Sequence, residues 1–180
     1  MSQTGIPIVV VTSNEDNVES ILGLDNATVT ELISRNVQIK SVIVEKDAQE
    51  QIGLRILLNF GHTIAHALES VSGFELLHGE AVGLGMLAAA SLGTELGITE
   101  PSTSQRLTTA LGLLDLPTRL PSSVDPERML VAMTHDKKNR GGSVRFALLK
   151  NIGQAAPGPG GRWTHTAPDS ILRSVLARLM

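Results

Sequence analysis

Apolar residues recur every three or four positions between residues 54 and 72, which is the spacing of a helix with one buried face. This face is formed by Leu54, Leu57, Leu58, Ile64, Ala65 and Leu68. Gly73 follows, and glycine readily takes the left-handed conformation that ends a helix. The pattern therefore predicts one continuous helix that begins at residue 54 and stops at Gly73.

Cap residues and prolines mark the starts of further helices. Asp25 and Asn26 are candidate N-caps, and Thr28 with Glu31 has the spacing of a capping box. Proline suits the first position of a helix, where its missing N–H needs no partner. These signals predict helices over residues 27–44, 79–97, 101–114, 126–135 and 168–180. The packing stripe expected in the last of them is formed by Ile171, Leu172, Val175, Leu176 and Leu179.

Two short runs are typical of strands rather than helices. Residues 7–11 and 144–149 are rich in β-branched or apolar side chains, whereas residues 12–19 are polar and are expected to form a loop. We therefore predict a mainly α fold, a helical domain with a short β-hairpin-like element. The expected organisation is a strand plus loop or an N-terminal remnant over 1–24, a helical domain over 25–156, a Pro/Gly linker over 157–167 and a C-terminal helix over 168–180.

Composition narrows the class of protein. The chain has 180 residues, 42% hydrophobic and 18% charged, so it can bury one core as a globular domain. Its net charge of -3 argues against a broad nucleic-acid surface. It has no cysteine, so any metal must be held by histidine and carboxylate side chains. No apolar run reaches the roughly 20 residues of a membrane span, and the first residues lack a secretory signal, so a cytoplasmic location is expected.

The helix predicted over residues 79–97 is unusually rich in small residues. They are Gly83, Gly85, Ala88, Ala89, Ala90 and Gly93. Small side chains let neighbouring elements approach closely, so this segment is expected to pack tightly in the core rather than to bind a ligand.

A polar stripe accompanies the apolar face of the helix predicted over residues 54–72. Its members, at i, i+4, i+7 and i+11, are Arg55, Asn59, His62 and His66. His78 follows at the start of the next predicted helix, and imidazole nitrogens are natural zinc ligands. A single histidine in such a helix is usually an ordinary core or surface residue. The gathering of three of the chain's five histidines beside a cation and an amide leaves that interpretation and a metal or anion site both open.

Three motifs, in this order, resemble those of 3-dehydroquinate synthase. They are L-R-x-L-L-N-F-G-H-T-x-x-H-A-x-E, L-H-G-E-A-V-x-x-G-M and D-K-K-N-R-G-G, and the likeness covers roughly residues 22–155. The wider group of sugar-phosphate cyclases, including the 2-deoxy-scyllo-inosose synthases, shares much of this pattern. The iron-dependent alcohol and glycerol dehydrogenases share its general histidine arrangement. The resemblance implies a fold like the C-terminal domain of 3-dehydroquinate synthase.

The resemblance also implies a reaction, that of a carbon–oxygen lyase in the shikimate pathway, which leads to aromatic amino acids. The family converts a phosphorylated seven-carbon keto-acid into 3-dehydroquinate and phosphate. Bound NAD oxidises one alcohol, phosphate is eliminated, the ketone is reduced again, and the ring closes by an aldol step. A Zn2+ (or Co2+) ion lowers the pKa of the hydroxyl that is oxidised.

Carried over position by position, the resemblance gives individual residues roles. It implies His62 and His78 as metal ligands. The substrate-binding positions it implies are Lys40, Arg55 and Lys137, which would hold a phosphate and a carboxylate, and Asn59, whose amide would also bind the substrate. His66 matches the histidine of a proton relay, and Glu50 matches an acidic residue that accepts a proton. Without the resemblance, Lys40 would be taken for a solvated surface cation.

The chain departs from the family pattern in three places. The N-terminal half of the family is a dinucleotide-binding domain, for which the segment before residue 54 is too short, and no G-x-G-x-x-G follows a strand. The family's third zinc ligand, a glutamate in an E-x-x-K pattern, is missing, although catalytic zinc usually has three protein ligands. One extra residue between Glu50 and Leu54 shifts Glu50 relative to the family.

The resulting hypothesis is a C-terminal, metal- and substrate-binding half of a 3-dehydroquinate synthase over residues 25–156. It would be inactive or nearly so alone, and NAD is expected only with a separate N-terminal half. The family also implies a homodimer, with no nucleic-acid or membrane partner. The alternatives are another sugar-phosphate cyclase, a polyol dehydrogenase relative, or a non-catalytic helical domain that binds a partner or an anion. Cations at positions 40, 55 and 137 favour a phosphorylated acid over a neutral polyol.

Overall fold

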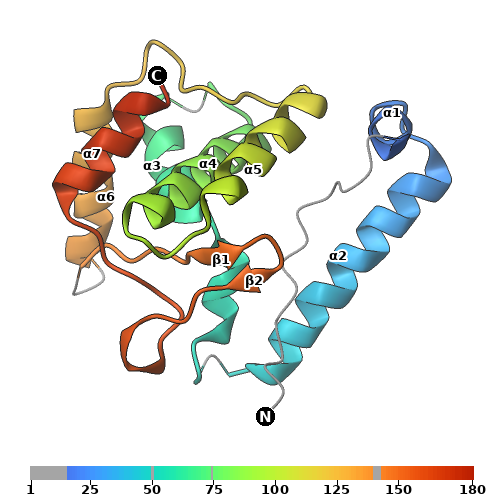
Figure 1. Ribbon diagram of the computed structural model, residues 1–180, viewed down its shortest axis with the longest axis horizontal. Helices are drawn as coiled ribbons and strands as arrows, with labels where there is room; N and C mark the ends of the chain where they lie inside the picture. The colour runs from blue at the N-terminus through green and yellow to red at the C-terminus, as the bar shows by residue number, and fades with distance from the viewer. Residues whose placement is uncertain (1–15, 50, 74, 140–142) are drawn as a thin grey trace.

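The computed structural model describes residues 16–49, 51–73, 75–139 and 143–180, with residues 16–18 and 135–139 described in backbone only. Most of these residues are helical (Figure 1). In chain order the elements are α1 (Asp16–Leu22), α2 (Asn26–Lys46), the 3-10 helix η1 (Leu54–Asn59), α3 (His62–Val71), α4 (His78–Glu95), α5 (Pro101–Leu113), α6 (Pro126–Asn139), β1 (Leu149–Asn151), β2 (Gln154–Ala155), the 3-10 helix η2 (Pro159–Gly161) and α7 (Asp169–Arg178). The prediction of a mainly α fold with a short hairpin is confirmed. The strand predicted over residues 7–11 lies outside the described residues.

Helix α4 is the centre of the fold and packs against α3, α5, α7 and β1 (Figure 1). The small residues of this helix are buried, as predicted, and neighbouring elements approach its backbone closely. Gly85 shows how closely, because a Cβ at this position would collide with the carbonyl oxygen of Gly61. A close-packed interior leaves no room for that added atom. The position of α3 on α4 is therefore set by backbone contact.

The single helix predicted over residues 54–72 is wrong, because the structure has two helices there. Residues 54–59 form η1, the chain turns at Phe60 and Gly61, and α3 begins at His62. Gly61 has a φ of 83°, and a Cβ there would lie 2.6 Å from the backbone nitrogen of Met86. The turn thus depends on the close approach to α4, which local periodicity does not encode. The stop at Gly73 is confirmed, since α3 ends at Val71 and Gly73 has a φ of 66°.

Helix α2 stands apart from this body, with α1 at its far end (Figure 1), and it contacts α1 and η1. Its predicted start is confirmed, because Asp25 accepts a hydrogen bond from the backbone N–H of Thr28 at 2.8 Å. The predicted Thr28–Glu31 capping box is wrong, since Glu31 forms an ion pair with Arg35. The predicted loop over residues 12–19 is also wrong from Asp16 onward, where α1 begins.

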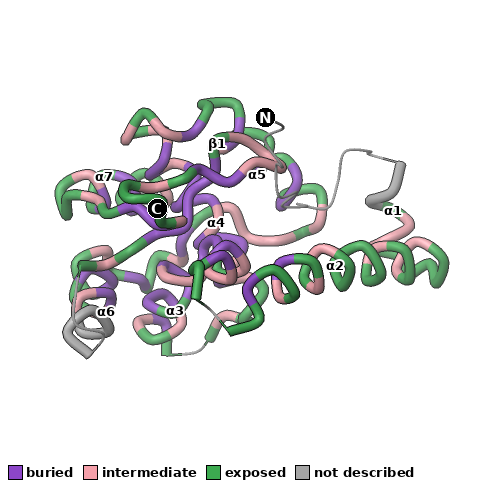
Figure 2. The backbone as a smooth tube through the Cα atoms, turned by 90° about the horizontal axis from the view of Figure 1, so that it is seen from below, coloured by how far each residue is buried: buried purple, intermediate pink, exposed green. Residues whose placement is uncertain are grey.

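The surface of α2 is exposed along most of its length, in contrast to α4 (Figure 2). Ile43 is its buried residue, and it packs with Leu54, Leu57 and Ala155 in a small second core. No helix of the described ranges, including the 21 residues of α2, is long and apolar enough to cross a membrane.

The C-terminal third wraps around the helical body. The strand predicted over residues 144–149 is wrong over most of its length, because β1 begins only at Leu149. This strand pairs antiparallel with β2. Before it, the backbones of Phe146 and His165 exchange two hydrogen bonds of 2.9 Å. Helix α6 extends to Asn139, beyond the predicted end at residue 135, because the helix continues into the basic segment.

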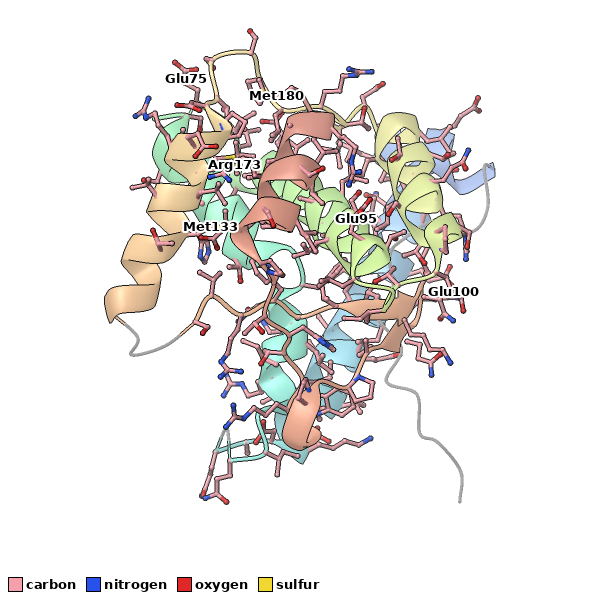
Figure 3. All side chains as sticks on the ribbon, turned by 60° about the vertical axis from the view of Figure 1, so that its left-hand side comes forward. Glu75, Glu95, Glu100, Met133, Arg173 and Met180 are labelled. Atoms are coloured by element: carbon pink, nitrogen blue, oxygen red, sulfur yellow. The ribbon has the colours of Figure 1, made fainter. Side chains whose placement is uncertain are left out.

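Helix α7 closes the body against α4 and α6. Its predicted packing stripe is confirmed in the buried side chains of Leu172, Val175 and Leu176. Arg173 on the same helix points toward α6, where its guanidinium donates a 3.0 Å hydrogen bond to Glu127 (Figure 3).

Candidate functional site

Three histidine rings converge where the first turns of α3 and α4 meet. His62 is the first residue of α3, His66 lies one turn later, and His78 is the first residue of α4. The distance between ring centroids is 5.6 Å for His62 and His78, 5.8 Å for His62 and His66, and 6.4 Å for His66 and His78. Because α3 and α4 pack against each other, the core of the fold holds these rings together.

The three rings differ in burial and in their partners. His62 is half-buried, with its Nδ1 3.4 Å from the carbonyl oxygen of Phe60, whereas His66 and His78 are exposed. Burial lowers the pKa of His62; the Phe60 carbonyl opposes this shift, and the charges of His66 and His78 reinforce it. His62 is therefore held toward its neutral form, which is the form that binds metal ions.

Glu69 is a candidate residue that sequence reasoning missed. Its Oε1 lies 2.9 Å from Nδ1 of His78, and its side chain is 14% exposed, against 60% for His78. The sequence held a signal for it, because Glu69 continues the stripe of His62 and His66 by one further turn of the helix. It is also the last residue of the first family motif.

Asp47 organises the segment that leads into η1. Its carboxylate accepts hydrogen bonds from the backbone N–H groups of Ile52 (3.0 Å), Leu54 (2.6 Å) and Arg55 (3.3 Å). Burial alone would raise the pKa of Asp47, but these donors and the N–H of Gln51 together hold it below its ordinary value. The buried carboxylate thereby fixes the backbone that carries the half-buried Arg55.

Asn59 ends η1 and lines a small pocket that is too narrow to hold a water molecule. Its other lining residues are Gly61, Thr63, Ile64, Ala89, Phe146 and Ala147. The Thr63 hydroxyl donates a hydrogen bond of 3.1 Å to the carbonyl oxygen of Arg145 and so ties α3 to the segment before β1. This pocket adjoins the first turn of α3 but is lined mainly by apolar side chains.

The remaining predicted site residues are distributed over several elements. Arg55 and Asn59 lie on η1, before the turn at Gly61, so the expected single stripe with His62 and His66 is wrong. Lys40 is exposed on α2. Lys137 lies in α6, where the structure describes the backbone only, and Glu50 lies outside the described residues.

The histidines are candidate members of a metal-binding set. The rings of His62 and His78, 5.6 Å apart, are close enough for one nitrogen of each to reach a common ion, because a Zn–N bond is about 2.0–2.1 Å long. Within the described residues, no three His, Asp or Glu side chains are arranged to hold a metal ion. Two imidazoles fit a metal as donors, but a catalytic zinc site usually adds a third protein ligand.

Solved structures of sugar-phosphate cyclases share this fold. A 2-deoxy-scyllo-inosose synthase complexed with carbaglucose-6-phosphate, NAD+ and Co2+ aligns with a TM-score of 0.72 and 22% identity over 82% of this chain and 40% of that one. A 2-epi-5-epi-valiolone synthase from Streptomyces hygroscopicus subsp. jinggangensis, with NAD+ and Zn2+ bound, aligns with a TM-score of 0.73 and 24% identity over 92% of this chain and 45% of that one. The fold is that of one part of a sugar-phosphate cyclase.

Sequence comparisons narrow this class to one family. A family model described as 3-dehydroquinate synthase C-terminal matches residues 9–139. The 3-dehydroquinate synthase of Nostoc punctiforme is 42% identical over 81% of this chain and 38% of the relative, and that of Shewanella pealeana is 43% identical over 78% and 39%. The chain belongs to the 3-dehydroquinate synthase family, as its motifs predict. It spans less than two fifths of the length of these relatives.

Proposed function

We propose that this chain is the metal- and substrate-binding part of a 3-dehydroquinate synthase, which acts together with a complementary NAD-binding part. The observation that carries the proposal is the convergence of His62, His66 and His78 on one site. The identity of about two fifths to relatives named 3-dehydroquinate synthase supports this reaction over that of other cyclases. The reaction would form 3-dehydroquinate and phosphate in the shikimate pathway.

In this proposal His62 and His78 hold a divalent ion, Zn2+ or Co2+. Such an ion, when bound, would polarise the substrate hydroxyl that is oxidised. The lowered pKa of His62 favours the neutral ring that a metal requires. The complementary part would contribute a third ligand and the NAD. This division agrees with the bound NAD+ and Zn2+ of the 2-epi-5-epi-valiolone synthase, a structure of which this chain covers 45%.

The other predicted site residues would position the substrate and move its protons. Arg55, whose backbone is fixed by Asp47, would bind the phosphate or carboxylate in a fork of two hydrogen bonds. Asn59, Lys40 and Lys137 would complete the anion site. The exposed ring of His66 would transfer a proton, a role in which imidazole is the commonest side chain. Glu50 remains the predicted proton acceptor.

The exposed face of α2 supports the need for a complementary part. Ile33 and Val37, one helical turn apart, are 57% and 60% exposed, and Leu24 just before the helix is 74% exposed. A second protein surface would bury these side chains and hold Lys40, on the same helix, near the substrate. The part of the relatives that this chain does not match is long enough to supply such a surface.

A reconstitution assay tests the proposal. The chain is mixed with the N-terminal part of the Nostoc punctiforme relative, NAD, Zn2+ or Co2+ and the seven-carbon phosphorylated keto-acid, and phosphate release is measured. We expect phosphate release from the mixture and not from either part by itself. Arg55→Ala should abolish the release, whereas Arg106→Ala, which changes an exposed arginine on α5, should not. No phosphate release with either metal would refute the proposed enzyme function and leave the non-catalytic binding domain.

Other sugar-phosphate cyclases are the second candidate, because solved structures with this fold include them. The same mixture should then be offered glucose 6-phosphate and a seven-carbon sugar phosphate without a carboxylate. Faster phosphate release from either of these than from the keto-acid would assign the chain to that reaction instead.

A further inference from the structure

We propose that Glu69 is a positioning residue that holds the His78 ring in one tautomer, with the proton on Nδ1, and so leaves Nε2 free to bind a metal ion. The inference deepens the proposed metal-binding function and rests on it. Glu69 itself would touch neither metal nor substrate.

The contact joins two different helices at the site. Glu69 lies in the second half of α3, and His78 begins α4. The distance of 2.9 Å between Oε1 of Glu69 and Nδ1 of His78 is that of a hydrogen bond, and the acceptor is a carboxylate, which strengthens it. Nδ1 must carry the proton to donate in this pair, so Nε2 carries the lone pair.

The carboxylate is the fixed member of the pair. The side chain of Glu69 is 14% exposed, whereas that of His78 is 60% exposed, so burial restrains Glu69 and leaves the ring dependent on its partner. The backbone at His78 is held separately, because Glu80 accepts a 2.8 Å hydrogen bond from the N–H of Leu77. Glu80 therefore fixes the start of α4, and Glu69 fixes the ring.

The consequence for metal binding follows from general chemistry. A metal-binding imidazole usually donates its other N–H to a carboxylate or carbonyl, which sets the tautomer and raises the basicity of the ligating nitrogen. Loss of such a partner typically weakens metal binding by ~10–100-fold. The ordinary alternative is a salt bridge that only ties α3 to α4, which would affect stability without selecting a tautomer.

The first experiment determines the tautomer of His78 directly. Long-range 1H–15N NMR spectra of the metal-free, histidine-labelled chain, recorded where the rings are neutral, distinguish the two tautomers, and His78→Gln assigns the signal. We expect His78 protonated on Nδ1 in the wild type and a shift toward Nε2 protonation in Glu69→Ala. Glu69→Gln, whose amide oxygen still accepts, should retain part of the effect. Glu75→Ala, which removes an exposed carboxylate at the surface (Figure 3), should leave the tautomer unchanged.

Isothermal titration with Zn2+ supplies the second reading. Affinity should fall ~10–100-fold in Glu69→Ala and stay unchanged in Glu75→Ala. A wild-type His78 protonated on Nε2, or a tautomer that is the same in Glu69→Ala, would overturn the proposal. An Nδ1-protonated His78 that depends on Glu69, in a chain that binds no Zn2+, would instead refute metal binding by this chain alone and leave the positioning role standing.

Discussion

The α3–α4 pair and the arm formed by α1 and α2 both carry predicted site residues, but they are held in place differently. In the pair, buried side chains and the contact of Gly61 with Gly85 fix the first turns of the helices. The positions of the histidines are fixed with them. The arm contacts η1 and exposes the apolar face of α2, so Lys40 lies on a helix with little support from the described chain. The comparison teaches that the histidine cluster is preformed by the packing of this chain, whereas the proposed place of Lys40 in an anion site requires a further surface.

The largest difference between the two regions is expected in how much a substitution lowers the free energy of unfolding. Leu68 in α3 is fully buried, so Leu68→Ala should lower the free energy of unfolding by about 2–5 kcal/mol. Val37 in α2 is 60% exposed, and Val37→Ala should change it by less than about 0.5 kcal/mol. Urea denaturation of both variants measures this contrast. Equal losses would mean that α2 is packed as firmly as the body.

The second largest difference between the two regions is expected in the effect of substitutions on Zn2+ affinity. His62→Ala removes one of the two proposed imidazole donors and should weaken Zn2+ binding by at least ~10-fold, whereas Lys40→Ala on the arm should leave it unchanged. Isothermal titration of the wild type and the two variants measures the affinities. If the wild type and His62→Ala bind Zn2+ equally, these rings are not a metal site.

The two regions also differ in how much of each the sequence predicted. Caps and stops depend on neighbouring residues, so the start of α2 at Asp25 and the stop at Gly73 could be predicted. The turn at Gly61 could not, since it depends on the approach of α4, and Gly85 is distant in sequence. That one turn separated Arg55 and Asn59 from the stripe of the histidines.

Periodicity also predicts a buried face without saying what buries it. The apolar positions of α2 have helical spacing, yet Ile33 and Val37 remain exposed in this chain. For the site, the motifs predicted the histidines and contain Glu69, whereas the contact of Glu69 with His78 appears only once α3 and α4 are placed together. Sequence therefore predicts the candidate residues of a site more readily than the contacts between them.

A smaller, local effect is expected at the junction between the two regions. The pKa of Asp47 is held below the ordinary value of 3.8, so its stabilising contribution is complete above that pH and is lost as the pH falls through the lower folded value. NMR should show the amide signals of Ile52 and Leu54 shifting together with a midpoint below 3.8. Asp47→Asn should abolish the shared transition, and Asp115→Asn, at an exposed position, should not. Independent midpoints for the two amides would contradict this role.

A substitution on the exposed face of α2 should have the smallest effect on the stability of the isolated chain. The same substitution should strongly weaken binding to a complementary part. Ile33→Asp places a charge on a side chain that is 57% exposed, so the free energy of unfolding should change by less than about 0.5 kcal/mol. If a complementary part covers this face, burying the new charge would be costly, and binding of the N-terminal part of a relative should weaken by at least ~10-fold. Gln38→Asp, at an exposed polar position of the same helix, is the matched control. Titrations that give equal affinities for both variants would mean that the partner leaves α2 uncovered, and Lys40 would then lose its proposed place in the anion site.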